Sequence, residues 1–74
     1  MTERVIDILS EFTGLRKEMI TEQSALAADL GLNSLDVINM VVIFEEEFDI
    51  EIPDQDIKEL AMVGDIVSYL DAHV

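Results

Sequence analysis

The sequence contains no cysteine, no tryptophan, one histidine and one proline among its 74 residues. Without cysteine the chain has no disulfide bond and no thiolate zinc site, and a single histidine cannot by itself form an imidazole metal site. We therefore predict no metal centre. A domain this small then depends on its hydrophobic core alone for stability.

Basic residues are also scarce. Four Lys and Arg residues stand against 17 Asp and Glu residues, which gives a formal net charge of −13. Nucleic acid is a poor ligand for such a chain, because binding would bring phosphates against carboxylates without releasing counterions. The expected partners are proteins with basic surfaces. Half of the residues are nevertheless apolar, too many for a disordered acidic tail, so the sequence predicts one folded domain over residues 1–74.

Long apolar runs are absent. The longest extends from Met40 to Phe44, which is far shorter than a membrane span, and acidic residues occupy the N-terminal segment where a secretory signal would be apolar. We expect a cytoplasmic protein that does not insert into membranes and that acts as a monomer.

Helical periodicity predicts an all-α fold. Apolar residues recur at intervals of three and four in most of the chain, and Gly14 and Pro53 interrupt the pattern. Thr2 and Asp54 are expected to cap the first and third helices. The predicted helices are Thr2 to Phe12, Ser34 to Phe48, a short helix after Pro53, and Val63 to Ala72. They form a small antiparallel four-helix bundle, with three main helices, a short third helix and a long loop after the first.

The long loop between Gly14 and Asn33 has weak periodicity. A structureless connection of about twenty residues is unusual in a compact domain. We therefore expect a short helical turn capped by Ser24, in which Leu26 and Leu30 anchor the loop to the core.

The second helix carries two apolar stripes when its residues are placed 100° apart around the axis. One stripe is an ordinary core face and consists of Val37, Met40, Val41, Phe44 and Phe48. The other consists of Leu35, Ile38 and Val42 and is bordered by acidic residues. The second stripe either packs under the long loop or the third helix, or it is a docking surface for basic partners. The predicted docking residues are Leu35, Asp36, Ile38, Val42, Glu45 and Glu46.

Acidic residues are concentrated near this stripe. The segment from Asp36 to Glu59 contains nine acids and one lysine, so it holds eight of the 13 net negative charges. Charge of one sign beside an apolar strip steers and orients a transient partner.

Ser34 begins the second helix. Either Asn33 or Ser34 can be the N-cap, and Asn33 with Asp36 imitates a capping box. A capping Ser34 would have a purely structural role. If Asn33 caps the helix, the Ser34 hydroxyl remains free in the first turn, where backbone N–H groups favour a phosphate.

Two motifs resemble the acyl carrier proteins and related phosphopantetheine carrier domains. Residues 29–36, Asp-Leu-Gly-Leu-Asn-Ser-Leu-Asp, are similar to the attachment motif D-L-G-x-D-S-L-D of that family. Residues 44–54, Phe-Glu-Glu-Glu-Phe-Asp-Ile-Glu-Ile-Pro-Asp, are similar to its helix-two exit, L-E-E-E-F-x-x-E-I-P-D. The resemblance covers essentially the whole chain and is strongest to the bacterial fatty-acid type.

The resemblance implies that Ser34 carries a 4′-phosphopantetheine arm from coenzyme A, attached by a phosphopantetheinyl transferase. Acyl groups would form thioesters with the thiol of the arm, which agrees with a chain that has no thiol of its own. The domain would be a non-catalytic carrier that presents acyl intermediates to acyl-transferring and synthase enzymes with basic docking surfaces. Fatty acid synthesis is the first expectation for its pathway.

Four residues depart from the family pattern. Asn33 replaces the usual Asp before the attachment serine, and Leu32 is larger than the usual residue. Asn39 stands where an acid is common and Ile43 where a small residue is common. These departures favour a specialised carrier for a polyketide, aminoacyl or other secondary pathway as an alternative. A carrier fold without an arm, acting as an acidic interaction module, is a second alternative.

Other site classes fit less well. The nucleophile elbow G-x-S-x-G is not met around Ser34, and His73 lies at the C-terminus where little can hold it. A calcium-binding loop that began at Asp49 or at Asp54 would lack the glycine that its sixth position requires. Neither a serine hydrolase nor a calcium-binding loop is predicted.

Overall fold

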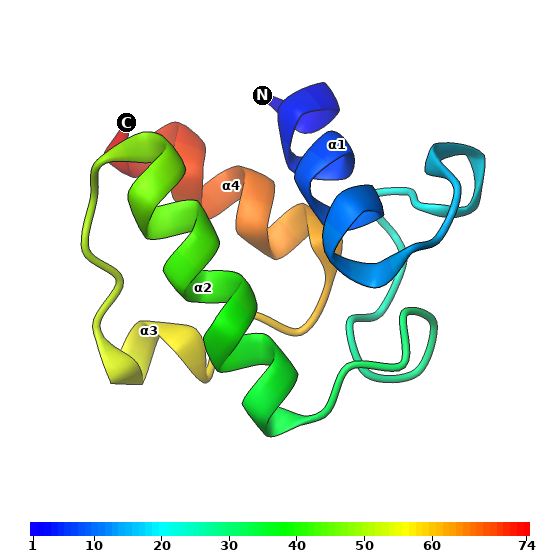
Figure 1. Cartoon of the computed structure of the whole chain (residues 1–74). Helices are drawn as coiled ribbons and strands as arrows, with labels where there is room; N and C mark the ends of the chain where they lie inside the picture. Colours follow the sequence, from blue (N-terminus) through cyan, green and yellow to red (C-terminus); the bar gives the residue numbers. More distant parts are fainter.

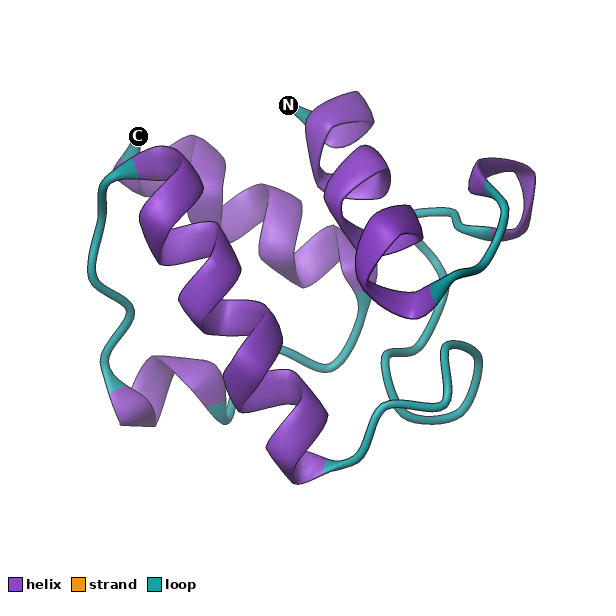
Figure 2. Cartoon of the chain, viewed as in Figure 1, coloured by secondary structure: helices purple, strands orange, loops and turns teal.

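The structure is a computed structural model that describes residues 1–74, and it is all-helical with no strand (Figure 1). Its segments are α1 (Thr2–Thr13), the 3-10 turn η1 (Lys17–Met19), α2 (Ser34–Phe48), α3 (Asp54–Ile57) and α4 (Val63–His73). Figure 2 shows that loops connect them. The predicted fold class is confirmed, and both predicted ends of α2 agree with the structure. No helix has the length and apolar character needed to cross a bilayer.

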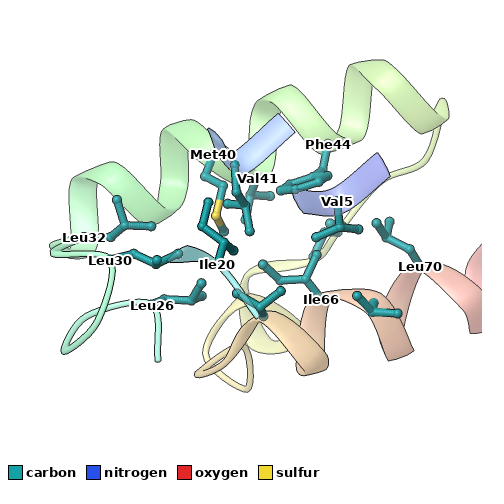
Figure 3. Close-up of a cluster of buried hydrophobic side chains, with 14 of the residues drawn as sticks. Val5, Ile20, Leu26, Leu30, Leu32, Met40, Val41, Phe44, Ile66 and Leu70 are labelled. Atoms are coloured by element: carbon teal, nitrogen blue, oxygen red, sulfur yellow. The ribbon is translucent and has the colours of Figure 1, made fainter. Parts of the chain in front are cut away.

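One hydrophobic core of 15 buried residues holds the helices together (Figure 3). Four core residues come from the predicted inner face of α2, namely Met40, Val41, Phe44 and Phe48. Val37 completes that face but is only partly buried. The remaining helical core residues are Val5 and Leu9 of α1 and Val63, Ile66, Val67 and Leu70 of α4. The periodicity of the sequence therefore identified the buried face of α2 correctly.

The long loop after α1 is fixed to the core by apolar side chains. Leu26 and Leu30 are buried as predicted, and Ile20 and Leu32 are buried as well. Backbone hydrogen bonds also join the loop to the segment before α4, from Leu26 N to Ala61 O (2.9 Å) and from Val63 N to Ser24 O (3.0 Å). The loop is therefore ordered by its long-range contacts, although only η1 within it is regular helix.

Gly64 lies in close contact with the loop at the start of α4. Its N–H donates to the backbone carbonyl of Glu22 (2.8 Å), and a Cβ on Gly64 would lie 3.1 Å from that oxygen. A side chain at this position would therefore require a small shift of the Glu22 carbonyl.

Three capping predictions are wrong. The N-cap of α1 is Met1, and the Thr2 hydroxyl instead donates to the Glu22 carboxylate (3.1 Å). Ser24 does not cap a helical turn, because its Oγ accepts a hydrogen bond from the backbone N–H of Thr21, on its N-terminal side (3.0 Å). The N-cap of α3 is Pro53, with no side-chain cap, so Asp54 lies inside the helix. Thr2 and Ser24 thus form hydrogen bonds other than helix caps, and Asp54 forms no cap bond.

Candidate functional site

Helix α2 begins at a capping box formed by Asn33 and Asp36. The Asn33 side-chain oxygen accepts from the Asp36 backbone N–H (2.8 Å), and the Asp36 carboxylate accepts from the Asn33 N–H (3.1 Å). Of the two possible caps, the structure uses Asn33. The Ser34 hydroxyl is therefore not needed for the cap, and Ser34 is exposed in the first turn of the helix.

The residues before Asn33 hold this position in place. The Asp29 carboxylate accepts a hydrogen bond from the Ala25 N–H (2.7 Å) and so closes the turn between them. Leu30 and Leu32 are buried, and Gly31 between them adopts the left-handed conformation at φ +72°. Glycine reaches that conformation without steric cost. The loop thus delivers Ser34 to the surface from a chain segment that is anchored on both sides.

The electrostatics of this position suit an anion. The unpaired N–H groups and the helix dipole place positive potential at the N-terminus of α2, and Ser34 is the first residue of a 15-residue helix. A phosphate bonded to the Ser34 oxygen would lie at that end of the helix.

An open groove of about 540 Å³ lies beside Ser34, between α2 and α3. Leu32, Val37, Ile38 and Ile57 supply apolar side chains to its lining. Figure 1 shows α3 beside the N-terminal half of α2, which is the arrangement that forms the groove. The sequence did not predict this groove, because it depends on how a four-residue helix packs against α2.

The second apolar stripe of α2 faces solvent. Leu35, Ile38 and Val42 are 66%, 51% and 45% exposed, whereas the adjacent Val41 is 2% exposed. The alternative in which this stripe packs under the long loop or under α3 is therefore wrong, although Ile38 also lines the groove. We call Leu35, Ile38 and Val42 the exposed strip.

The acidic residues predicted beside the strip have different surroundings. Glu46 is exposed, and Asp36 belongs to the capping box. Glu45 is partly buried, and its carboxylate accepts a hydrogen bond from the Ile52 N–H (2.8 Å), which holds the loop between α2 and α3. Glu45 therefore has a structural contact that the sequence did not predict. No group of three or more His, Asp or Glu side chains is arranged to hold a metal ion.

A side-chain hydrogen bond joins α3 to α4. The Tyr69 hydroxyl donates to the Asp56 carboxylate (2.8 Å), and the ring of Tyr69 stacks on that of His73, with centroids 4.0 Å apart. Desolvation, together with the bond to Asp56, raises the pKa of the Tyr69 hydroxyl above its ordinary value. No pattern in the sequence indicates this bond, because its two partners lie 13 residues apart. This bond positions the short helix that borders the groove.

Comparison with known proteins places these features in a family. A family model described as "Phosphopantetheine attachment site" matches residues 3–70. The acyl carrier protein of Clostridium acetobutylicum is 41% identical over 71 residues, which cover 96% of this chain and 92% of the relative. That of Zymomonas mobilis is 42% identical over 71 residues, covering 96% and 91% of the two chains.

A third relative agrees with these two. The acyl carrier protein of Syntrophobacter fumaroxidans is 43% identical over 70 residues, which cover 95% of this chain and 86% of the relative. The match extends over nearly the full length of each protein, and the segment that contains Ser34 lies within the region of the family model. The chain therefore belongs to the phosphopantetheine carrier family and is similar throughout its length to acyl carrier proteins.

Proposed function

We propose that this chain is an acyl carrier protein that holds acyl intermediates on a 4′-phosphopantetheine arm joined to the Oγ atom of Ser34. The observation that carries the proposal is that Ser34 is exposed at the start of α2, where Asn33 and not Ser34 caps the helix. Ser34 also lies within the region that the family model matches. When bound, the arm supplies the thiol that forms thioesters, which this cysteine-free chain cannot supply itself.

The residues around Ser34 fit this group. The N-terminus of α2 stabilises a phosphodiester, and the neighbouring groove offers apolar walls to the part of the arm next to the phosphate. The thiol end of a long flexible arm then reaches several enzymes in turn at high effective concentration. The chain itself contributes attachment, position and charge, so we propose that it is non-catalytic.

The exposed strip is the proposed docking surface. Leu35, Ile38 and Val42 offer apolar contact area, and Asp36, Glu45 and Glu46 are the proposed docking acids around them. Carboxylates beside an apolar strip accelerate encounter with basic surfaces and orient the partner, while the apolar contact supplies affinity. The proposed partners are a phosphopantetheinyl transferase and the acyl-transferring and synthase enzymes, which the carrier meets as a cytoplasmic monomer.

Fatty acid synthesis is the proposed pathway. Similarity to acyl carrier proteins over nearly the whole chain supports an acyl cargo rather than an aminoacyl one. A specialised carrier for a secondary pathway is the second candidate, and Leu32 favours it, because this large side chain occupies the lining of the groove beside Ser34. Partner enzymes choose among such cargoes more than the carrier does.

Thiol titration tests the proposal against an acidic interaction module without an arm. The unmodified protein should show no reactive thiol, because it contains no cysteine. Incubation with coenzyme A and a broad-specificity phosphopantetheinyl transferase, followed by removal of small molecules, should raise the content to one thiol per chain. A protein that remained thiol-free after this treatment would be the interaction module, and the carrier proposal would fail.

A further inference from the structure

Lys58 is the only basic residue between Asp36 and Glu59, in the segment that holds most of the negative charge. The two ion pairs of the structure involve other cations. Arg4 pairs with Glu47 (3.5 Å) and Lys17 pairs with Asp7 (2.8 Å). Lys58 therefore has an ammonium group with no carboxylate partner, although acids are abundant around it in sequence.

Lys58 lines the same groove as Ser34. It directly follows α3, and its neighbour Ile57 forms part of the apolar wall. Asp54 is the only acidic residue in the lining. A groove of about 540 Å³ is small enough that a charge bonded to Ser34 and the side chain of Lys58 interact within one Debye length.

Attachment of the arm adds a negative charge in the neighbourhood of two carboxylates. Asp36 lies two residues beyond Ser34, and Asp54 lines the groove, so a phosphodiester on Ser34 is repelled by both carboxylates. The N-terminus of α2 offsets part of this repulsion. Among charged side chains of the lining, Lys58 is the only one whose sign favours the phosphodiester.

We propose that Lys58 binds the phosphodiester of the arm and holds the first atoms of the arm in the groove between α2 and α3. Lys58 is then a positioning residue: it fixes the direction in which the arm leaves Ser34, and the thiol end stays free to move. This inference rests on the attachment at Ser34 proposed above.

NMR of the lysine side chains in the apo and arm-bearing proteins tests the proposal. A phosphodiester bound by Lys58 lies against its ammonium group, so the side-chain signals of Lys58 should shift when the arm is attached. Lys17 is the internal control, since it is paired with Asp7 and does not line the groove. Its signals should not change.

The phosphorus NMR signal of the arm gives the second readout. Lys58→Gln should shift this signal and lengthen the relaxation times that report motion at the phosphate, whereas Lys17→Gln, with the same loss of charge, should leave both unchanged. Circular dichroism verifies that both variants keep the helical fold, as expected for exposed side chains.

Two outcomes would overturn the inference, and a third would overturn its basis. Unchanged side-chain signals of Lys58 in protein whose intact mass confirms the arm would refute the role of Lys58 alone. A shift that appears only when the arm carries an acyl group with a free carboxylate would assign Lys58 to the cargo instead of the phosphodiester. Failure of the protein to gain the arm would refute the attachment at Ser34, and the role of Lys58 with it.

Discussion

Ser34→Ala should abolish attachment of the phosphopantetheine arm completely. The substitution removes the one oxygen that we propose forms the phosphodiester bond, and no neighbouring hydroxyl occupies the first turn of α2. Intact-mass spectrometry after incubation with coenzyme A and a transferase should therefore show the wild type with one added phosphopantetheinyl group and the variant with none.

The fold of this variant should be unaffected. Asn33 and Asp36 form the cap of α2 without the Ser34 hydroxyl, so its loss should change the free energy of unfolding by less than about 0.5 kcal/mol. Ser68→Ala is the matched control, because Ser68 is an exposed serine on α4 and its loss should leave modification complete. A Ser34→Ala protein that was still modified would place the arm elsewhere.

Val41→Asp and Val42→Asp should have opposite consequences, although the two residues are identical and adjacent. Val41 is 2% exposed and belongs to the core, whereas Val42 is 45% exposed on the strip. A carboxylate at position 41 would be buried without a partner, at a cost of about 3 kcal/mol or more. A domain with one small core and no disulfide should not remain folded with that loss.

Val42→Asp should keep the fold and weaken enzyme recognition. The new carboxylate lies in solvent, so the circular dichroism spectrum should match that of the wild type. The apolar contact with a docked enzyme is lost, however, and we expect kcat/KM of the transferase to fall about tenfold, which corresponds to about 1.4 kcal/mol. Unfolding of Val42→Asp would show that this stripe belongs to the core, and an unchanged kcat/KM would show that enzymes dock elsewhere.

The helices were predictable because their signals are local. In α2, both ends of the helix, its core face and its second apolar stripe follow from signals along one segment. The choice of Asn33 over Ser34 as the cap and the exposure of the stripe came from the structure. The absence of strands and the anchors Leu26 and Leu30 were predictable for the same reason, since apolar spacing identifies the buried side of each segment. The start of α2 was therefore defined before its surroundings were known.

The surroundings of Ser34 depend on partners that are distant in sequence. The Tyr69 hydroxyl bonds to Asp56 of α3, 13 residues away, and the Glu45 carboxylate bonds to the Ile52 N–H in the loop before α3, so both bonds help to set the packing of α3. No spacing rule along the chain predicts such bonds. The groove, and with it the position of Lys58, is a product of this packing and could be identified only in the folded chain.

The structure also shows how the acidic residues near the exposed strip are arranged. The composition made nucleic acid a poor ligand, and the sequence predicted the surface of α2 that a basic partner meets, without showing which of its acids are free. The structure places Glu46 in solvent on the helix that carries the exposed strip and uses Glu45 and Asp36 partly for internal hydrogen bonds. The carboxylates around the strip thus stabilise α2 and its loop locally, in addition to the partner steering that we propose for them.

The most direct test of the carrier assignment is to locate the added group by fragmentation mass spectrometry of the modified protein. We expect one phosphopantetheinyl group per chain, carried by the fragments that contain Ser34 and absent from those that contain the other serines, Ser10, Ser24 and Ser68. A group found on another residue, or no added group after exhaustive treatment with transferase and coenzyme A, would contradict it.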